Sequence, residues 1–258
     1  MAAFAFAAEC GAQRVVSYNV GAFRKWGGNS YALVASIISD AEPDFVALQE
    51  VDSCTVRTKG VNQAERVCEE LNALPCTESP WKWAYCAAMP YGGGGYGNAV
   101  LYRGEAVRIT RIAIPKGSGS EPRCCVAVET QNAVFASVHL DHKSSDAALA
   151  GAKKITSVLR KLYSKSEKPV ILCGDFNSLP ESATVKYMSK KWIAVSAANE
   201  PSYPCCAEKD ATDCIDYVWV LKNKAHFASF DSEVASDIPW RSVRSASDHY
   251  PLAATITR

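Results

Sequence analysis

Apolar and polar residues recur with two different spacings along this chain, one typical of strands and one typical of helices. Residues 14–20 (RVVSYNV) are β-branched and aromatic with partial alternation, which predicts a strand with a polar tip at Asn19. Apolar residues recur at helical spacing over 31–41, and an apolar run at 45–48 predicts a second strand that delivers Glu50 to its far end. Strand, helix and strand in this order predict a βαβ unit, whose strands are near neighbours. Asn19 and Glu50 are therefore expected at one edge of a sheet.

The rest of the chain mixes strands and helices. Strands are predicted at 81–87, 98–102, 106–114, 123–129, 133–140, 170–173, 214–221, 225–230 and 251–256, and helices at 62–73, at 146–163 and from about Pro180. The run YGGGGY at 91–96 is too rich in glycine for either element and lacks the Lys-Ser/Thr of a phosphate-binding Walker loop, so it predicts a flexible hairpin connection. With no internal repeat, the pattern predicts two sheets packed face to face with helices outside.

Composition favours a globular chain with one large core. The 258 residues are 48% hydrophobic and 21% charged, and we expect a single domain over 13–258. Residues 1–12 are expected to be a disordered terminus or the remnant of a signal peptide, because the apolar start is short and lacks a basic region. No run reaches the roughly 18–20 apolar residues of a membrane-spanning helix, so no transmembrane segment is expected.

Cysteine is abundant, and its count of eleven is odd, so at least one thiol stays outside an intramolecular disulfide. The adjacent pairs at 124–125 and 205–206 point to opposite faces if extended, and no CxxC or Cys/His cluster indicates zinc. We expect cysteine mainly as a small core residue. One or two bridges remain open among Cys54, Cys68, Cys76, Cys86, Cys205, Cys206 and Cys214.

Polar side chains collect where predicted strands end. In KPVILCGDFNSLP the apolar run 170–173 meets Gly174, after which Asp175 and Asn177 point to one side and Phe176 to the other. Alone, this stretch is most simply a strand followed by a turn. Similar positions are held by Asn19, Glu50, His139, Asp248 and His249, and Asp216 lies within an otherwise apolar strand. Because buried charged and imidazole groups are costly unless paired or metal-bound, these side chains predict one shared site.

The residue types indicate the chemistry of that site. Asn19, Glu50 and Asp248 offer hard oxygen ligands, which suit Mg²⁺, or alternatively Mn²⁺, better than zinc. Magnesium in turn implies phosphate, whose ester hydrolysis needs an oriented water, neutralised phosphoryl oxygens and a protonated leaving oxygen.

Further residues supply those needs. Asp175, His139 and His249 are candidates for the proton and water chemistry, and Asn177 for hydrogen bonds to phosphoryl oxygens. Asp216 is expected to hold His249 in one tautomer. A further basic residue, Arg123, is either a phosphate ligand or a solvated strand-end charge.

Taken singly, these residues have simpler explanations. Asn19 is a turn residue, Glu50 a solvated strand end and His139 a satisfied core histidine. Asp141 and His142 are expected to be structural or peripheral. Their joint occurrence in one chain is what favours a site.

The motifs YNV, LQEVD, SVHLDH, ILCGDFNSLP, CIDYVWV and SASDHYPL, in this order, resemble the endonuclease/exonuclease/phosphatase family. The resemblance implies an α/β (α+β) four-layer α-β-β-α sandwich of two mixed, mainly antiparallel sheets with the catalytic cleft at one edge. It implies a divalent metal near Glu50, surrounded by Asn19, Glu50 and Asp248. The segments DSCTVRT, AMPY and EPR resemble compact members from Bacteroides-type bacteria, many of them exported, which favours a secreted or periplasmic protein over a cytoplasmic one.

The same resemblance assigns roles to the remaining residues. Asp175 and Asn177 handle the nucleophilic water and the phosphate, and His139, His249 and Asp216 do proton and charge work. Which histidine is acid and which is base stays open.

We therefore predict a divalent-metal-dependent phosphoester hydrolase, either a phosphodiesterase (nuclease) or a phosphatase, in which water attacks phosphorus. The substrate is open among nucleic acid, a lipid head group and a sugar phosphate, although 28 Lys and Arg against 27 Asp and Glu argue against tight duplex binding. The alternative is a catalytically inactive binding module on the same sandwich. We expect a monomer without an obligate protein partner, because one chain holds the complete site.

Overall fold

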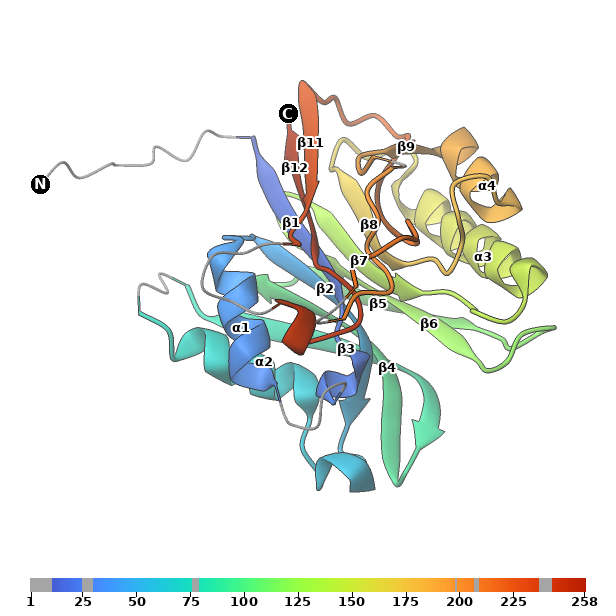
Figure 1. Cartoon of the computed structure of the whole chain (residues 1–258). Coiled ribbons are helices and arrows are strands. Elements are labelled where there is room, and N and C mark those ends of the chain that lie inside the picture. Colours follow the sequence, from blue (N-terminus) through green and yellow to red (C-terminus); the bar gives the residue numbers. More distant parts are fainter. Residues whose placement is uncertain (1–10, 25–29, 76–78, 198, 207–208, 237–242) are drawn as a thin grey trace, which may run out of the picture.

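Two six-stranded β-sheets lie face to face, and helices cover both outer faces (Figure 1). The computed structural model describes residues 11–24, 30–75, 79–197, 199–206, 209–236 and 243–258. Residues 1–10, the largest part of the predicted terminal segment, lie outside this range. Among the described residues, none of the helices combines the length and apolar character needed to cross a membrane.

The first sheet is built around a parallel pair. Its strand order is β11-β12-β1-β2-β4-β3. The bounds are β1 (Gln13–Asn19), β2 (Phe45–Ser53), β3 (Trp81–Tyr91), β4 (Gly94–Arg103), β11 (Ser229–Val234) and β12 (Leu252–Thr257). β1 runs parallel to β2 and antiparallel to β12. Helix α1 (Tyr31–Asp40) connects β1 to β2, so the predicted βαβ unit is confirmed.

The second sheet repeats this plan with the order β5-β6-β7-β8-β10-β9. The bounds are β5 (Arg108–Ile114), β6 (Arg123–Glu129), β7 (Val134–His139), β8 (Val170–Asp175), β9 (Trp192–Ala194) and β10 (Asp216–Leu221). Helix α3 (Ser145–Tyr163) connects the parallel strands β7 and β8, and α4 (Ala183–Lys191) packs beside it. The side chain of Ser144 caps α3 by accepting a hydrogen bond from the Ala147 N–H.

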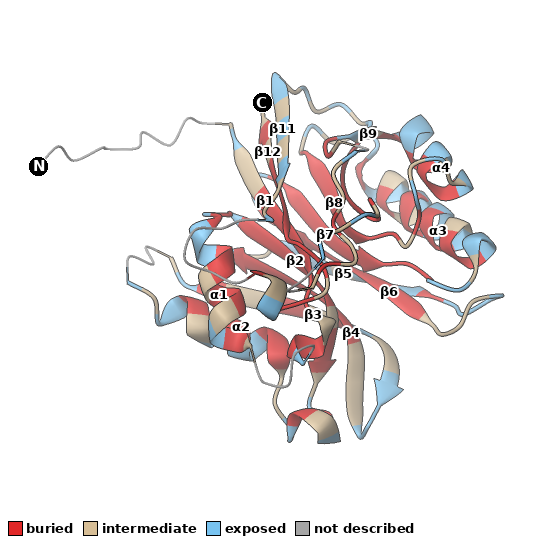
Figure 2. Cartoon of the chain, in the orientation of Figure 1, coloured by how far each residue is buried: buried red, intermediate tan, exposed pale blue. Residues whose placement is uncertain are grey.

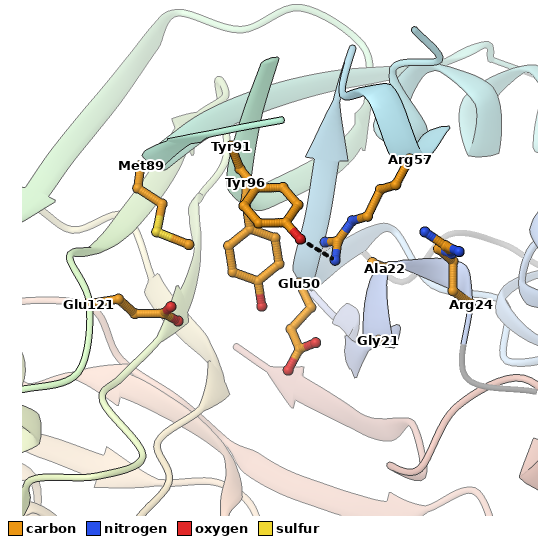
Figure 3. Close-up of a pocket in the computed structure, with 9 residues that line it drawn as sticks. All are labelled: Gly21, Ala22, Arg24, Glu50, Arg57, Met89, Tyr91, Tyr96 and Glu121. Carbon is orange, nitrogen blue, oxygen red and sulfur yellow. Dashed lines mark hydrogen bonds between the residues drawn. The ribbon is translucent and has the colours of Figure 1, made fainter. Parts of the chain in front are cut away.

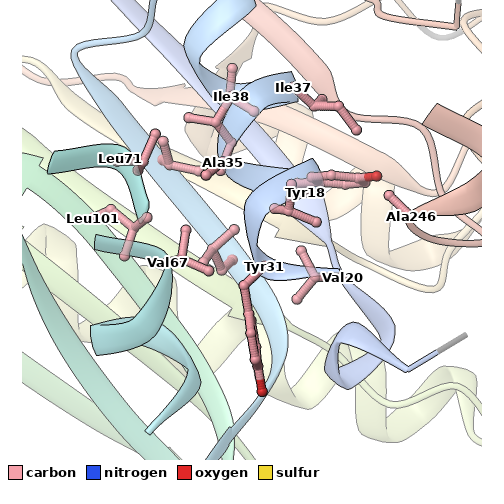
Figure 4. Packing of buried hydrophobic residues seen from close by; sticks show 14 of the residues in the cluster. Tyr18, Val20, Tyr31, Ala35, Ile37, Ile38, Val67, Leu71, Leu101 and Ala246 are labelled. Carbon is pink, nitrogen blue, oxygen red and sulfur yellow. The ribbon is translucent and has the colours of Figure 1, made fainter. Parts of the chain in front are cut away.

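Three apolar clusters fill the three spaces between the four layers. The first joins α1 and α2 (Gln63–Asn72) to the first sheet, with Ile38 and Leu71 facing Tyr18 and Leu101 (Figure 4). The second joins α3 and α4 to the second sheet, and the third lies between the sheets. Figure 2 shows the central strands buried and the outer helix faces exposed. The predicted four-layer α-β-β-α sandwich is confirmed.

Three predicted boundaries were wrong. The glycine-rich run forms the predicted hairpin connection, but it is shorter than expected: only Gly92 and Gly93, both with positive φ, form the turn between β3 and β4. β8 continues past Gly174 to Asp175, because that strand stays paired with β7 and β10. The strand predicted at 225–230 is β11 at Ser229–Val234, because pairing with β12 selects its position rather than its own hydrophobicity.

The nine described cysteines are all free, whereas Cys10 and Cys76 lie outside the described residues. Cys124 packs between the two sheets and Cys125 under α3, so this pair points to opposite faces as predicted. In the described residues, cysteine therefore serves chiefly as a small apolar core residue.

Candidate active site

The polar strand ends meet at one edge of the sandwich. β1 and β7 end there with Asn19 and His139, and β8 ends there with Asp175. Asp216 opens the antiparallel strand β10 and pairs directly with Asp175, so it lies at the same edge. His249 precedes β12, which runs antiparallel to β1 and therefore starts where β1 ends.

A β-bulge directs Glu50 into this edge. Leu48 pairs with Ala99 and Val51 with Gly97, so two residues of β2 oppose one residue of β4. Glu50 takes a φ of 57°, a left-handed conformation that non-glycine residues rarely adopt. Strict alternation from Leu48 would turn Glu50 towards the helices, so the bulge aims its carboxylate at the site instead.

The turn after β8 presents Asp175 and Asn177 together. Asn177 has a φ of 46°, and its N–H donates to Asp175 Oδ1 at 2.8 Å. Its side-chain Nδ2 donates to the Leu140 carbonyl and lies 2.9 Å from His139 Nε2. Phe176 points the other way and is fully buried against Tyr217, as the alternation predicts. The turn therefore holds a carboxylate and an amide on one side of the chain.

His249 and Asp216 form a buried ion pair. His249 Nδ1 lies 2.8 Å from Asp216 Oδ2, which also accepts a hydrogen bond from the Ser202 hydroxyl at 2.6 Å. Burial opposes protonation of His249, but Asp216 and the further carboxylates Asp175 and Asp248 outweigh it and raise the His249 pKa to about 9. At neutral pH His249 is therefore an imidazolium.

Asp175 lies at the centre of the cluster. Its Oδ2 accepts a hydrogen bond from Asn19 Nδ2 at 3.1 Å and lies 3.7 Å from His249 Nε2. Burial, reinforced by the charge of Asp216, raises the pKa of Asp175 to about 7. Ligand atoms of Asp175, Asp216 and His249 all lie within 4.8 Å of one another. Such a group is suited to exchange a proton or to bind a cation.

The side-chain nitrogen of Asn19 points toward the carboxylates of Glu50 and Asp175. Its Nδ2 also donates to Glu50 Oε1 at 3.2 Å, while its Oδ1 accepts a hydrogen bond from the Gly21 N–H. Ligation of a metal through the predicted amide oxygen therefore requires the Asn19 amide to turn over.

Arg123 is buried rather than solvated. It forms an ion pair with Glu121 at 3.0 Å, and its Nη2 donates to His142 Nδ1 at 2.8 Å. Its Nη1 lies 3.4 Å from His139 Nδ1. Burial, with the charges of Arg123 and His249, holds the pKa of His139 well below its usual value. His139 is therefore neutral where His249 is charged.

One cavity of about 220 Å³, the strand-end cavity, joins these groups. Its lining includes the predicted residues Glu50, Arg123, His139, Asp175, Asn177, Asp248 and His249. Asn19 and Asp216 lie directly behind, hydrogen-bonded to Asp175 and His249. All the predicted site residues thus gather at one place.

The lining also contains residues that sequence reasoning did not assign to the site: Glu121, His142 and Tyr203. His142, which belongs to the SVHLDH motif and was expected to be structural or peripheral, lines the cavity and accepts a hydrogen bond from Arg123. Asp141 is structural as expected: it accepts hydrogen bonds from the backbone of Ser120, Lys143 and Ser144. Tyr203 comes from an irregular loop, where periodicity carries no signal.

Residues 16–249 match the sequence model of the endonuclease/exonuclease/phosphatase family. The chain belongs to this family. The endonuclease/exonuclease/phosphatase match begins in β1 and ends at His249, so it spans both sheets and every predicted site residue. Members of the family are hydrolases that act on phosphoesters. A comparison with curated proteins found no match.

Solved structures share the endonuclease/exonuclease/phosphatase fold. An endonuclease/exonuclease/phosphatase family protein from Bacteroides thetaiotaomicron is 20% identical, with a TM-score of 0.71, over 95% of this chain and 97% of that one. A mannosyl-6-phosphatase from the same organism is 20% identical, with a TM-score of 0.72, over 95% and 100%. The human Nocturnin catalytic domain with bound sulfate anion is 16% identical, with a TM-score of 0.70, over 96% and 93%.

Proposed function

We propose that this chain is a divalent-metal-dependent phosphoester hydrolase. The observation that carries the proposal is the strand-end cavity, in which buried carboxylates, two histidines with opposite pKa shifts and a buried arginine converge. Pairs of titratable groups whose pKa values are pushed apart are typical of acid–base catalysis. Membership of a family of phosphoester hydrolases supports the same reaction.

The donor set fits a hard divalent cation such as Mg²⁺. Glu50 and Asp248 both line the cavity, where water can complete the coordination shell. Asp216 Oδ1 is buried without a hydrogen-bond partner within the described residues, and Asp175 stands beside it. We assign the cation to Glu50 and Asp248 rather than to the buried group of Asp175, Asp216 and His249, because His249 is already paired with Asp216. When bound, the cation supplies charge neutralisation to the phosphoryl oxygens.

Residues of the chain itself supply the remaining catalytic roles. Asp175, whose pKa is raised to about 7, orients water and accepts its proton near neutral pH. The His249 imidazolium, fixed by Asp216, stabilises negative charge on the phosphoryl group. Asn177 and Arg123 donate hydrogen bonds to phosphoryl oxygens, and neutral His139 aligns Asn177.

The substrate is a small phosphoester, turned over by a monomer. The chain carries a net charge of only +1, which does not support the many phosphate contacts of duplex binding. A similar fold in a mannosyl-6-phosphatase supports a phosphomonoester.

The test compares hydrolysis of phenyl phosphate and bis(p-nitrophenyl) phosphate with Mg²⁺, with Mn²⁺ and with EDTA. We expect metal-stimulated hydrolysis that Glu50→Gln and Asp175→Asn each reduce by about 10²–10⁴-fold. Glu69→Gln, which alters a surface carboxylate of α2, is the matched control and keeps the wild-type rate. Absence of hydrolysis with either metal, or undiminished rates in EDTA, contradicts the proposal.

A further inference from the structure

A second pocket opens directly beside the strand-end cavity. This side pocket has a volume of about 460 Å³ and shares Glu50, Tyr96 and Glu121 with the strand-end cavity. Its other lining residues are Gly21, Ala22, Arg24, Arg57, Met89 and Tyr91. Figure 3 shows Arg24 and Arg57 on one side, Met89 and Glu121 on the other, and Glu50 between them. The rest of a molecule whose phosphoryl group lies in the strand-end cavity can therefore extend into the side pocket.

Arg57 is a fixed donor in this pocket. Its Nε and Nη2 donate to the two carboxylate oxygens of Asp52 at 2.5 and 2.8 Å. Asp52 is fully buried and also accepts a hydrogen bond from the Thr55 hydroxyl. Because this carboxylate holds the guanidinium in one plane and balances its charge, Arg57 is a positioned hydrogen-bond donor and not a free cation.

Two tyrosines give the pocket an aromatic wall. The Arg57 guanidinium lies 4.5 Å from the ring centre of Tyr91 and 5.7 Å from that of Tyr96. Tyr91 is 41% exposed, which leaves much of its ring open to a ligand. The two rings are 6.3 Å apart and inclined at 54°, so they do not form a parallel slot for a flat base. Ring faces beside hydroxyls suit a ligand with both C–H and O–H surfaces.

The charges around the pocket cancel. Asp52 balances the charge of Arg57, and Arg123 balances that of Glu121. The remaining Arg24 and Glu50 carry opposite charges, so the lining has no excess of positive charge. The lining therefore does not attract a second phosphate, as a nucleic-acid groove does through excess positive charge. It does offer both donors and acceptors for uncharged hydroxyl groups.

We propose that the side pocket binds the uncharged, polyhydroxylated ring of a phosphomonoester, with Tyr91 and Arg57 as specificity-determining residues. This inference rests on the proposed hydrolase function. In the reaction, the oxygen of water bonds to phosphorus, the bond between phosphorus and the ring's oxygen breaks, and the proton from water ends on that leaving oxygen. The products are inorganic phosphate and the free polyol. A free sugar phosphate and an inositol phosphate head group share this chemistry.

The test compares kcat/KM for hexose 6-phosphate, inositol 1-phosphate and adenosine 5′-monophosphate with that for methyl phosphate, which has no ring. We expect at least one of the two polyol phosphates to exceed methyl phosphate by about tenfold or more, and Tyr91→Ala to reduce that ratio about tenfold, chiefly through KM. Tyr187→Ala is the matched control, because Tyr187 on α4 is a partly exposed tyrosine with Lys153 near its ring. It leaves the ratio unchanged.

Arg57 needs a paired substitution, because removing it alone leaves the buried Asp52 charge unbalanced. The double variant Arg57→Gln with Asp52→Asn removes both charges and is expected to lower the same ratio. Its circular dichroism spectrum and melting temperature show whether it is folded.

Binding measured by calorimetry in EDTA separates this inference from the proposed function. No substrate is hydrolysed if the hydrolase proposal fails. In that case the inference stands if either polyol phosphate binds wild type at least about tenfold tighter than Tyr91→Ala. If methyl phosphate is hydrolysed as efficiently as both polyol phosphates, or the nucleotide is preferred over both, the inference is overturned while the hydrolase proposal stands. The inference is also overturned if Tyr91→Ala leaves the ratio of kcat/KM for the polyol phosphate to kcat/KM for methyl phosphate unchanged.

Discussion

At the scale of single residues, the charge state of His249 depends chiefly on Asp216 among its three neighbouring carboxylates. Asp216→Asn removes the carboxylate that lies 2.8 Å from His249 Nδ1. We therefore expect the His249 pKa to fall from about 9 towards the ordinary value of about 6.5, since burial then opposes protonation with less compensation. NMR titration of the imidazole protons in EDTA measures the shift. A His249 that still titrates near pH 9 in Asp216→Asn contradicts the pairing.

The sequence predicted those features of the site that depend on short stretches of the chain. Asp175 and Asn177 lie two positions apart beside an apolar run, so their common direction follows from alternation. The pairing of His249 with Asp216 joins residues 33 positions apart and follows from the strand order. Asp216 was nevertheless predicted to hold His249 in one tautomer, as carboxylates beside a histidine commonly do.

At the scale of elements, the β2 bulge that directs Glu50 is supported from the opposite sheet. Ser137 on β7 donates to the Leu48 carbonyl at 2.9 Å and accepts a hydrogen bond from Gln49 Nε2 at 3.1 Å. We expect Ser137→Ala to lower the free energy of unfolding by about 1–3 kcal/mol, because it leaves buried polar groups unsatisfied.

Urea denaturation measures this loss. Ser17→Ala is the matched control: the Ser17 hydroxyl is buried without a hydrogen-bond partner in the described part of the chain, so its removal is neutral or stabilising. Equal stabilities of the two variants would show that Ser137 does not support the bulge.

At Gly174, β8 leaves no room for a side chain beside β7. A Cβ at this position would lie 1.9 Å from the Val138 carbonyl oxygen, inside the parallel pair that carries Asp175. We expect Gly174→Ala to cost more than about 3 kcal/mol, because the backbone of the sheet must move.

Gly60 provides the comparison for this prediction. It has a φ of +80° with no atom within 4 Å of an added Cβ, so Gly60→Ala costs only about 1–2 kcal/mol of backbone strain. Because Gly174 also has a positive φ of +154°, both substitutions strain the backbone and only Gly174→Ala adds a clash. The excess loss of stability in Gly174→Ala over Gly60→Ala, measured by denaturation, therefore reports the clash. Similar losses would mean that the strands adjust to the added methyl group.

The first βαβ unit followed from periodicity, because hydrophobic spacing is a local property of each segment. The parallel pairing of β7 with β8 was not predicted. The bulge was not predicted either, because it is defined only by the pairing of β2 with β4. Nor was the position of β11, an edge strand whose side chains alternate between exposed and half-buried and whose register comes from β12.

At the scale of the whole molecule, the proposed metal site joins β2 to the segment before β12, two parts of the first sheet that lie far apart in the sequence. A cation at Glu50 and Asp248 binds only the folded chain, so Mg²⁺ at about 100 times its Kd is expected to stabilise the protein by about 2.7 kcal/mol. For a chain of this size, that corresponds to a rise in Tm of roughly 5–10 °C. Thermal unfolding with and without Mg²⁺ measures it.

Glu50→Gln is expected to lose most of this rise, whereas Asp216→Asn keeps it. The opposite result would move the cation to the buried group of Asp175, Asp216 and His249. Because unfolding is the readout, the assignment does not depend on catalysis.

The amino-acid sequence by itself determined the layers of this protein and the chemistry available to it. Hydrophobic periodicity, turn residues and polar strand ends are properties of single segments, so each can be interpreted without the rest of the chain. The tertiary structure decided where that chemistry points: the bulge at Glu50, the His249–Asp216 pair and the side pocket around Arg57 and Tyr91. These features depend on hydrogen bonds and packing between segments that are distant in sequence, which no local pattern specifies.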